Sequence, residues 1–117
     1  MNLVIKTQTP NETTCILAVE GEVDVYTSPQ LKQEIVQHAA SGVKHLIINL
    51  SQVEYLDSTG LGVLIGSLKR FREVGGNVAL VGPGLRILRI FEITGLDKIF
   101  DIYPTEAEAA AKEGISL

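Results

Sequence analysis

The sequence has one cysteine, Cys15, and no tryptophan. A single cysteine excludes an internal disulfide, which fits a reducing compartment. We expect Cys15 to be a buried, unreactive thiol on a strand rather than a reactive one. The two histidines, His38 and His45, flank a turn and have no cysteine or carboxylate neighbour at the spacing of metal ligands. The sequence therefore predicts no disulfide, no metal site and no cofactor.

Basic residues are in the minority, with 10 Lys and Arg against 14 Asp and Glu and a net charge of -4. They are scattered and do not alternate with aromatics, so direct nucleic-acid binding is not predicted. No apolar run approaches the roughly 18 to 20 residues that span a bilayer, and the first residues, MNLVIKTQTPNE, lack a signal-peptide pattern. We expect a cytoplasmic protein that does not enter a membrane and that affects transcription, if at all, through another protein.

Apolar residues are abundant, at 45% of the chain. This share supports a folded core, and 117 residues are typical of one domain, which we expect to span residues 1–117. Hydrophobic periodicity and turn residues predict strands over 3–8, 15–19, 45–50, 78–81 and 99–102, and helices that begin near 28, 61, 85 and 105. This order predicts an α/β fold with a mixed, mostly parallel sheet of about five strands and about four helices packed against it.

Two segments place short polar residues where packing does not require them. They are GEVDVYT at residues 21–27 and YLDSTGLG at residues 55–62, and each follows a strand and precedes a helix. Turns of this kind lie at the carboxyl ends of parallel strands, where binding sites usually form. We therefore expect both segments to lie on one rim of the sheet, with Asp24 and Ser58 as neighbours.

One of Asp57, Ser58 and Thr59 is expected to cap the helix that follows, since each side chain accepts hydrogen bonds from free N–H groups of a first turn. Three consecutive polar residues exceed what one cap requires. Ser58 is not in a G-x-S-x-G context and has no histidine nearby as a general base. An enzyme that uses Ser58 as nucleophile is therefore disfavoured, although a histidine distant in the sequence is not excluded.

Gly60, Gly62 and Gly66 lie in or near the first turns of this helix, where each costs about 1 kcal/mol relative to alanine. Such a cost indicates that something lies close to the backbone of this helix, either the backbone of the sheet or a partner. The spacing is G-x-G-x-x-x-G rather than the dinucleotide-binding G-x-G-x-x-G, and the P-loop pattern is absent. Nucleotide binding is therefore disfavoured.

Two sequence regions resemble the signature regions of the STAS-domain anti-sigma factor antagonists of bacterial sporulation and general stress. They are GEVDVYTSPQL at residues 21–31 and YLDSTGLGVLIG at residues 55–66, and the second is the more specific. The resemblance covers the order of elements from about Leu3 to Tyr103, including RILRIFEITGLDKIF at residues 86–100. It implies the STAS fold, and Thr59 is an accepted variant of the motif.

The resemblance also implies a partner-switching cycle. In that cycle the unphosphorylated protein binds an anti-sigma factor that is also a serine kinase, and the sigma factor is released. The kinase uses ATP to phosphorylate the serine after the aspartate, here Ser58, and a PP2C-type phosphatase removes the phosphate. Ser58 is then a substrate, and the chain itself is not an enzyme.

Within this cycle we assign Asp57 and Thr59 to local geometry and kinase recognition, and Gly60 and Gly62 to close approach. Asp24 belongs to the neighbouring contact loop, where a turn or capping role is an equal alternative to direct partner contact.

Two broader alternatives remain. Ile87, Ile90 and Ile93 form a second partner surface or, as we favour, pack mostly into the core. The chain is also compatible with a STAS docking module in a signalling or lipid-transport assembly that has no kinase cycle.

Overall fold

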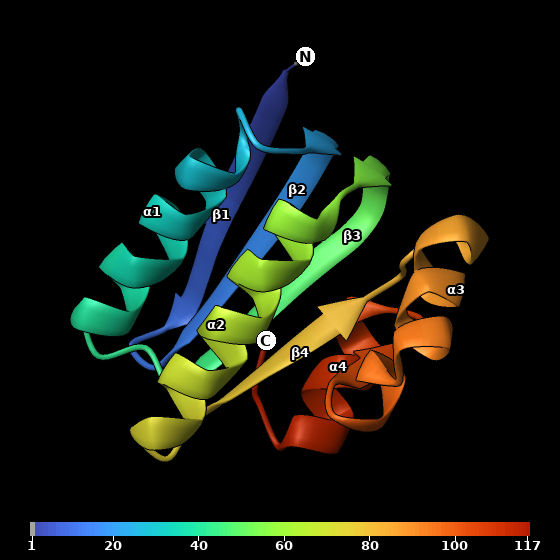
Figure 1. Ribbon diagram of the computed structural model, residues 1–117. Coiled ribbons are helices and arrows are strands. Elements are labelled where there is room, and N and C mark those ends of the chain that lie inside the picture. The colour runs from blue at the N-terminus through green and yellow to red at the C-terminus, as the bar shows by residue number, and fades with distance from the viewer. Residues whose placement is uncertain (1) are drawn as a thin grey trace.

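The structure, a computed structural model, describes residues 2–117 and places five strands and four α-helices in them (Figure 1). The elements are, in order, β1 (Leu3–Asn11), β2 (Thr14–Val23), α1 (Ser28–Ala40), β3 (His45–Leu56), α2 (Ser58–Glu73), β4 (Asn77–Val81), α3 (Leu85–Thr94), the 3-10 helix η1 (Leu96–Lys98), β5 (Asp101–Tyr103) and α4 (Glu106–Glu113). The α/β class and the number of elements predicted from the sequence are confirmed.

The strands form one sheet in the order β1-β2-β3-β4-β5. β1 pairs with β2 antiparallel, and every later pair is parallel. A short turn suffices for the antiparallel hairpin, whereas each parallel pair needs a crossover, which α1, α2 and α3 supply. These three helices cover one face of the sheet, and α4 covers the other (Figure 1).

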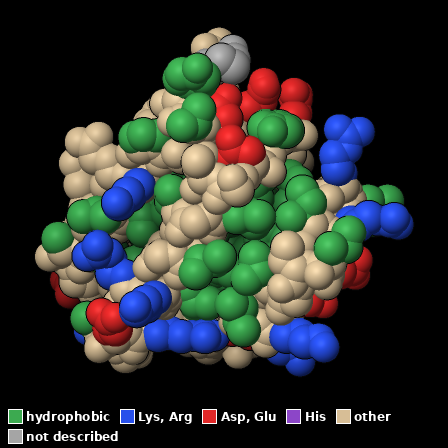
Figure 2. Space-filling view, in the orientation of Figure 1, with side chains coloured by type: hydrophobic (Ala, Val, Ile, Leu, Met, Phe, Trp, Pro, Cys, Tyr) green, Lys and Arg blue, Asp and Glu red, His purple; other side chains and the backbone are tan. Residues whose placement is uncertain are grey.

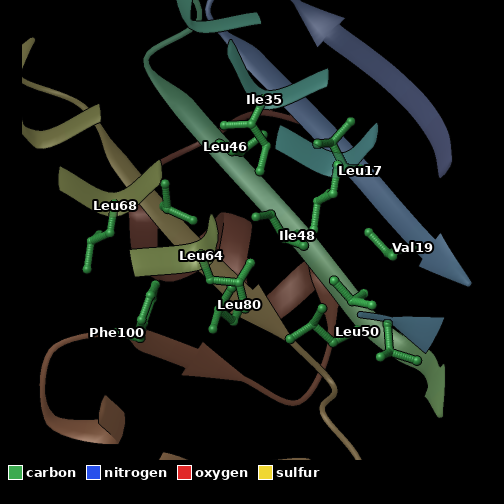
Figure 3. Close-up of a cluster of buried hydrophobic side chains, with 14 of the residues drawn as sticks. Leu17, Val19, Ile35, Leu46, Ile48, Leu50, Leu64, Leu68, Leu80 and Phe100 are labelled. Carbon is green, nitrogen blue, oxygen red and sulfur yellow. The ribbon is translucent and has the colours of Figure 1, made fainter. Parts of the chain in front are cut away.

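The core is built from strand residues that alternate between the two faces. Leu17, Ile48 and Leu80 are paired across β2, β3 and β4 and are fully buried beneath the three crossover helices (Figure 3). Their neighbours Ile47 and Ala79 are buried on the opposite face against α4. Because both faces are covered, the central strands are continuously apolar, as the sequence indicated.

Cys15 is completely buried on β2, and burial raises the pKa of its thiol to about 12. The thiolate is the reactive form of cysteine, so this thiol is inert at neutral pH. The expectation of a buried, unreactive Cys15 is confirmed.

β3 is longer than the sequence indicated. We expected a strand over 45–50 and a helix that begins near 61, but the strand continues to Leu56 and only Asp57 separates it from α2. Val53 and Leu56 are buried in this extension, while the polar residues around them are exposed. Irregularities in the pairing with β2 interrupt the simple two-residue alternation here, and this hid the strand from a periodicity argument.

The last strand also differs, since β5 covers Asp101–Tyr103 rather than residues 99–102. Ile99 is exposed and precedes the strand, and Phe100 is buried edge-to-face against Phe91 of α3, with ring centroids 5.6 Å apart. Phe100 therefore closes the core below α3 instead of joining the sheet. A tertiary contact, not strand propensity, decides where β5 begins.

Candidate functional site

The two polar segments lie side by side at the carboxyl ends of β2 and β3. Val23 and Leu56, the last residues of these strands, are paired, and the N–H of Asp57 donates to the carbonyl of Val23 at 3.1 Å. The expectation of a shared rim is confirmed. We call this edge, formed by residues 24–27 and 57–59, the Ser58 rim, and carboxylates gather along the top edge of the molecule where it lies (Figure 2).

Asp57 is the residue that caps α2. Its carboxylate accepts hydrogen bonds from the N–H groups of Thr59 (2.9 Å) and Gly60 (3.1 Å) and from the hydroxyl of Thr59. The Thr59 hydroxyl, followed by these backbone donors, holds the pKa of Asp57 below its usual value. Asp57 and Thr59 therefore form a local hydrogen-bonded unit that sets the geometry of the turn.

The cap makes a testable contribution to stability. Asp57→Ala is expected to lower the free energy of unfolding at neutral pH, because two first-turn N–H groups lose their acceptor. The pKa of Asp57 is lower in the folded chain, so this contribution is present above the unfolded pKa and is lost as pH falls through the folded pKa. Urea unfolding of both proteins across this range measures it, and a difference that stays constant at acid pH contradicts the ionised cap.

Ser58 is the first residue of α2, and its side chain is exposed. Its hydroxyl makes no hydrogen bond with any residue between 2 and 117, because Asp57 provides the cap. The hydroxyl therefore faces solvent at the positive end of the α2 dipole. Of the three polar residues at this turn, Ser58 is the one that the fold does not use.

Asp24 is buried and satisfied within its own loop. Its carboxylate accepts from the N–H groups of Tyr26 (2.9 Å) and Thr27 (3.0 Å) and from the Thr27 hydroxyl (3.2 Å). The Thr27 hydroxyl in turn donates to the carbonyl of Glu22 at 2.8 Å. These contacts favour the turn interpretation of Asp24, which shapes the rim beside Ser58.

The same loop exposes two apolar side chains that the sequence argument did not select. Tyr26 is 76% exposed and Val25 is 56% exposed, while the buried Asp24 carboxylate holds the loop in place. Exposed apolar residues beside a site are typical of contact surfaces. The signal was present in the sequence as a Val-Tyr pair inside a polar loop between a strand and a helix.

The glycines of α2 have different surroundings. A Cβ on Gly60 would lie 2.5 Å from Leu56 Cδ1 and 2.8 Å from Val23 Cγ1, so the close approach expected there comes from the sheet. A Cβ on Gly62 or Gly66 would have no neighbour within 4 Å. The fold therefore explains Gly60, and close approach at Gly62 stays a prediction about a partner.

The third helix divides between core and surface. Ile87 is 3% exposed and packs in the core, Ile90 is half-buried, and Ile93 is 77% exposed. Leu85 at the start of α3 is also exposed, and Figure 2 shows hydrophobic side chains gathered over the region between α2 and α3. Core packing thus accounts for Ile87 but not for Ile93.

Within residues 2–117 there is neither a membrane-spanning helix nor a cluster of metal-ligating side chains. No helix within residues 2–117 has the length and apolar character needed to cross a bilayer. In the same part of the chain, no three His, Cys, Asp or Glu side chains gather in a way that would hold a metal ion.

Comparisons with known proteins agree with the fold and the motif. Residues 4–109 match the family model of the STAS domain. The anti-sigma-B factor antagonist of Bacillus subtilis (strain 168) is 42% identical over 92 residues, which cover 79% of this chain and 84% of that protein. The crystal structure of an anti-sigma factor antagonist from Mycobacterium paratuberculosis is 31% identical, with a TM-score of 0.84 over 97% of this chain and 95% of that one. The chain therefore belongs to the STAS domain family, in its group of bacterial anti-sigma factor antagonists.

The fold is also shared with the phosphorylated form of the Bacillus cell-fate determinant SpoIIAA. That structure has a TM-score of 0.76 and 23% sequence identity, over 93% of this chain and 98% of that one. The resemblance noted from residues 21–31 and 55–66 is confirmed at the level of family and fold.

Proposed function

We propose that this chain is an anti-sigma factor antagonist controlled by phosphorylation of Ser58. The unphosphorylated form binds an anti-sigma factor that is also a serine kinase, and this binding frees a sigma factor. The kinase then transfers a phosphate from ATP to Ser58, which ends the interaction, and a PP2C-type phosphatase restores it. The observation that carries the proposal is an exposed serine hydroxyl, unused by the fold, within the family's motif.

The position of Ser58 explains how a phosphate acts on binding rather than on folding. A phosphate adds about -1.5 to -2 charges at neutral pH, and at the start of α2 the helix dipole favours that charge. Asp57, ionised beside it, and Asp24, the other carboxylate of the rim, oppose further negative charge. Placing a doubly charged group against a partner also carries a desolvation cost unless the partner pairs it. The interface therefore responds more strongly than the fold.

The remaining rim residues have supporting roles in this proposal. Asp57 and Thr59 present Ser58 to the kinase in a fixed turn, since their side chains are bonded to each other and to the first turn of α2. Asp24 holds the neighbouring loop, so that Val25 and Tyr26 are displayed beside Ser58 for contact with the partner. Gly62 lets the partner approach the exposed side of α2.

The relatives supply independent support. The B. subtilis protein is an anti-sigma-B factor antagonist, and the SpoIIAA structure is that of a phosphorylated form of a protein with this fold. The chain then acts in the bacterial cytoplasm as a regulatory binding protein, and Ser58 is the substrate of another enzyme.

The test is the intact mass of the protein after incubation with its cognate anti-sigma kinase and ATP. We expect the mass of one phosphate on the wild type and on Ser116→Ala, a control at another exposed serine, and none on Ser58→Ala. A phosphate on Ser58→Ala overturns the assignment of the site. A wild-type protein that binds the anti-sigma factor but takes up no phosphate overturns the kinase cycle and favours a docking module.

A further inference from the structure

A groove of about 320 Å³ lies between α1 and α2, outside the hydrogen-bonded turn that presents Ser58. It begins at Thr59, next to Ser58, and extends along α2 past Gly62 and Gly66 to Arg70, with Lys32 on the α1 side. Ser58, Gly62, Gly66 and Arg70 follow one another at intervals of four residues, so they lie along one side of α2. The groove thus ends one residue from Ser58, at Thr59.

The floor of the groove is open because Gly62 and Gly66 have no side chains. Apart from the nearby backbone of α2 itself, no atom of residues 2–117 lies within 4 Å of the place where either Cβ would be, so the packing of the fold does not require glycine at these positions. Glycine in a helix interior weakens the helix relative to alanine. Gly60, which the sheet does require, provides the contrast within the same helix.

The groove is positively charged within an acidic protein. Lys32 and Arg70 are exposed, and the one Lys or Arg ion pair formed within residues 2–117, Lys6 with Glu20, includes neither of them. The largest group of carboxylates on this face lies along its top edge, and Lys and Arg side chains lie along its left and lower edges with a few carboxylates among them (Figure 2). The charge favours an anionic occupant, and the length of the groove along α2 favours a chain segment.

Resting on the function proposed above, we propose that this groove binds a carboxylate-bearing segment of the anti-sigma factor. The segment's main chain lies against Gly62 and Gly66, and its carboxylates pair with Lys32 and Arg70. The volume is enough for a few side chains, at the lower end of the range for ligand sites. This occupant also explains the direction of the switch, because a phosphate on Ser58 adds negative charge at the end of a groove that holds an acidic segment.

Charge reversal tests the electrostatic part of the proposal. Lys32→Glu and Arg70→Glu are each expected to weaken binding of the anti-sigma factor about tenfold or more, with a larger loss in the double variant. Lys112→Glu, on α4 at the opposite face of the sheet, is the matched control and keeps wild-type affinity. Titration calorimetry measures these affinities, and equal binding by all four variants overturns the proposal.

Adding a side chain at Gly66 tests whether the main chain of the bound segment lies close to α2. Gly66→Ala is expected to raise the midpoint temperature of unfolding and at the same time to weaken binding, and Gly66→Leu to weaken it further. If the fold itself required glycine at position 66, Gly66→Ala would instead lower the midpoint temperature of unfolding. Undiminished binding by Gly66→Leu overturns the proposal and leaves the groove to a small ligand or a second copy.

The two proposals fail in different ways. A wild-type chain that does not bind the anti-sigma factor contradicts the proposed function itself. If the wild type binds and phosphorylation of Ser58 abolishes binding, but the groove variants bind like the wild type, the function stands and only the acidic-segment proposal fails.

Discussion

Ser58→Asp is expected to lower the affinity for the anti-sigma factor about a hundredfold while leaving the fold intact. The substitution adds a permanent negative charge next to the ionised Asp57 and at the end of the groove between α1 and α2. Like charges brought together at an interface cost several kcal/mol, and about 2.7 kcal/mol corresponds to a factor of 100. The loss in affinity therefore needs no change in structure.

Stability is expected to change by less than about 0.5 kcal/mol in the same variant. Ser58 is exposed and makes no hydrogen bond that the fold needs, and a negative charge in the first turn interacts favourably with the helix dipole. Repulsion from Asp57 offsets part of this gain. Titration calorimetry with the anti-sigma factor and urea unfolding measure the two quantities separately.

The neutral variant Ser58→Ala is the control for this experiment. It removes the phosphate acceptor without adding charge, so we expect binding close to that of the unphosphorylated wild type. Binding by Ser58→Asp at wild-type strength contradicts an electrostatic switch at this position. Global unfolding of Ser58→Asp contradicts the view that the fold does not use Ser58.

Gly60→Ala is expected to destabilise the protein by about 2 to 3 kcal/mol, the largest stability change among the variants considered. The added methyl group would lie 2.8 Å from Val23 Cγ1 and 3.2 Å from the Val23 carbonyl oxygen, as well as against Leu56. These groups belong to paired strand ends, and the two side chains are buried, so relief of the overlap requires them to repack or α2 to move away from the sheet. A movement of α2 also shifts the turn that carries Ser58.

Gly62→Ala is the matched control, two residues along the same helix. It meets no neighbour within 4 Å, so we expect it to stabilise the free chain by up to about 1 kcal/mol through its higher helix propensity. Urea unfolding of the two variants should thus give changes of opposite sign. Equal changes contradict the packing of Gly60 against the ends of β2 and β3.

The regular parts of the fold could be predicted from the sequence because they depend on local pattern. The apolar runs of the central strands, the glycine and proline breaks and the helical periodicity of residues 61–74 each specify an element within a few residues. The predicted helix start near residue 105 is the start of α4, where Thr105 accepts a hydrogen bond from the Glu108 N–H at 3.1 Å.

The elements that were predicted wrongly depend on distant partners. Residues 51–56 look like a loop because their polar residues break the pattern, yet pairing with β2 keeps them extended. Ile99 and Phe100 have strand character, but Phe100 packs in the core beneath α3 instead of joining the sheet. Pairing and core contacts outweigh local propensity in both cases.

The sequence by itself determined the fold class and the shared rim, since strand-to-helix turns of a parallel sheet meet on one edge whatever the packing details. The role of Ser58 stays a prediction, which comes from the resemblance of residues 55–66 to a known family. Only the tertiary structure decided which structural role each polar residue of the rim has. Asp57 caps α2, Asp24 is bonded within its loop, and the Ser58 hydroxyl is left free. It also separated Gly60, which the sheet requires, from Gly62, which nothing in the chain requires. Hydrogen-bond partners and free space are properties of three-dimensional neighbours, and residue spacing does not reveal them.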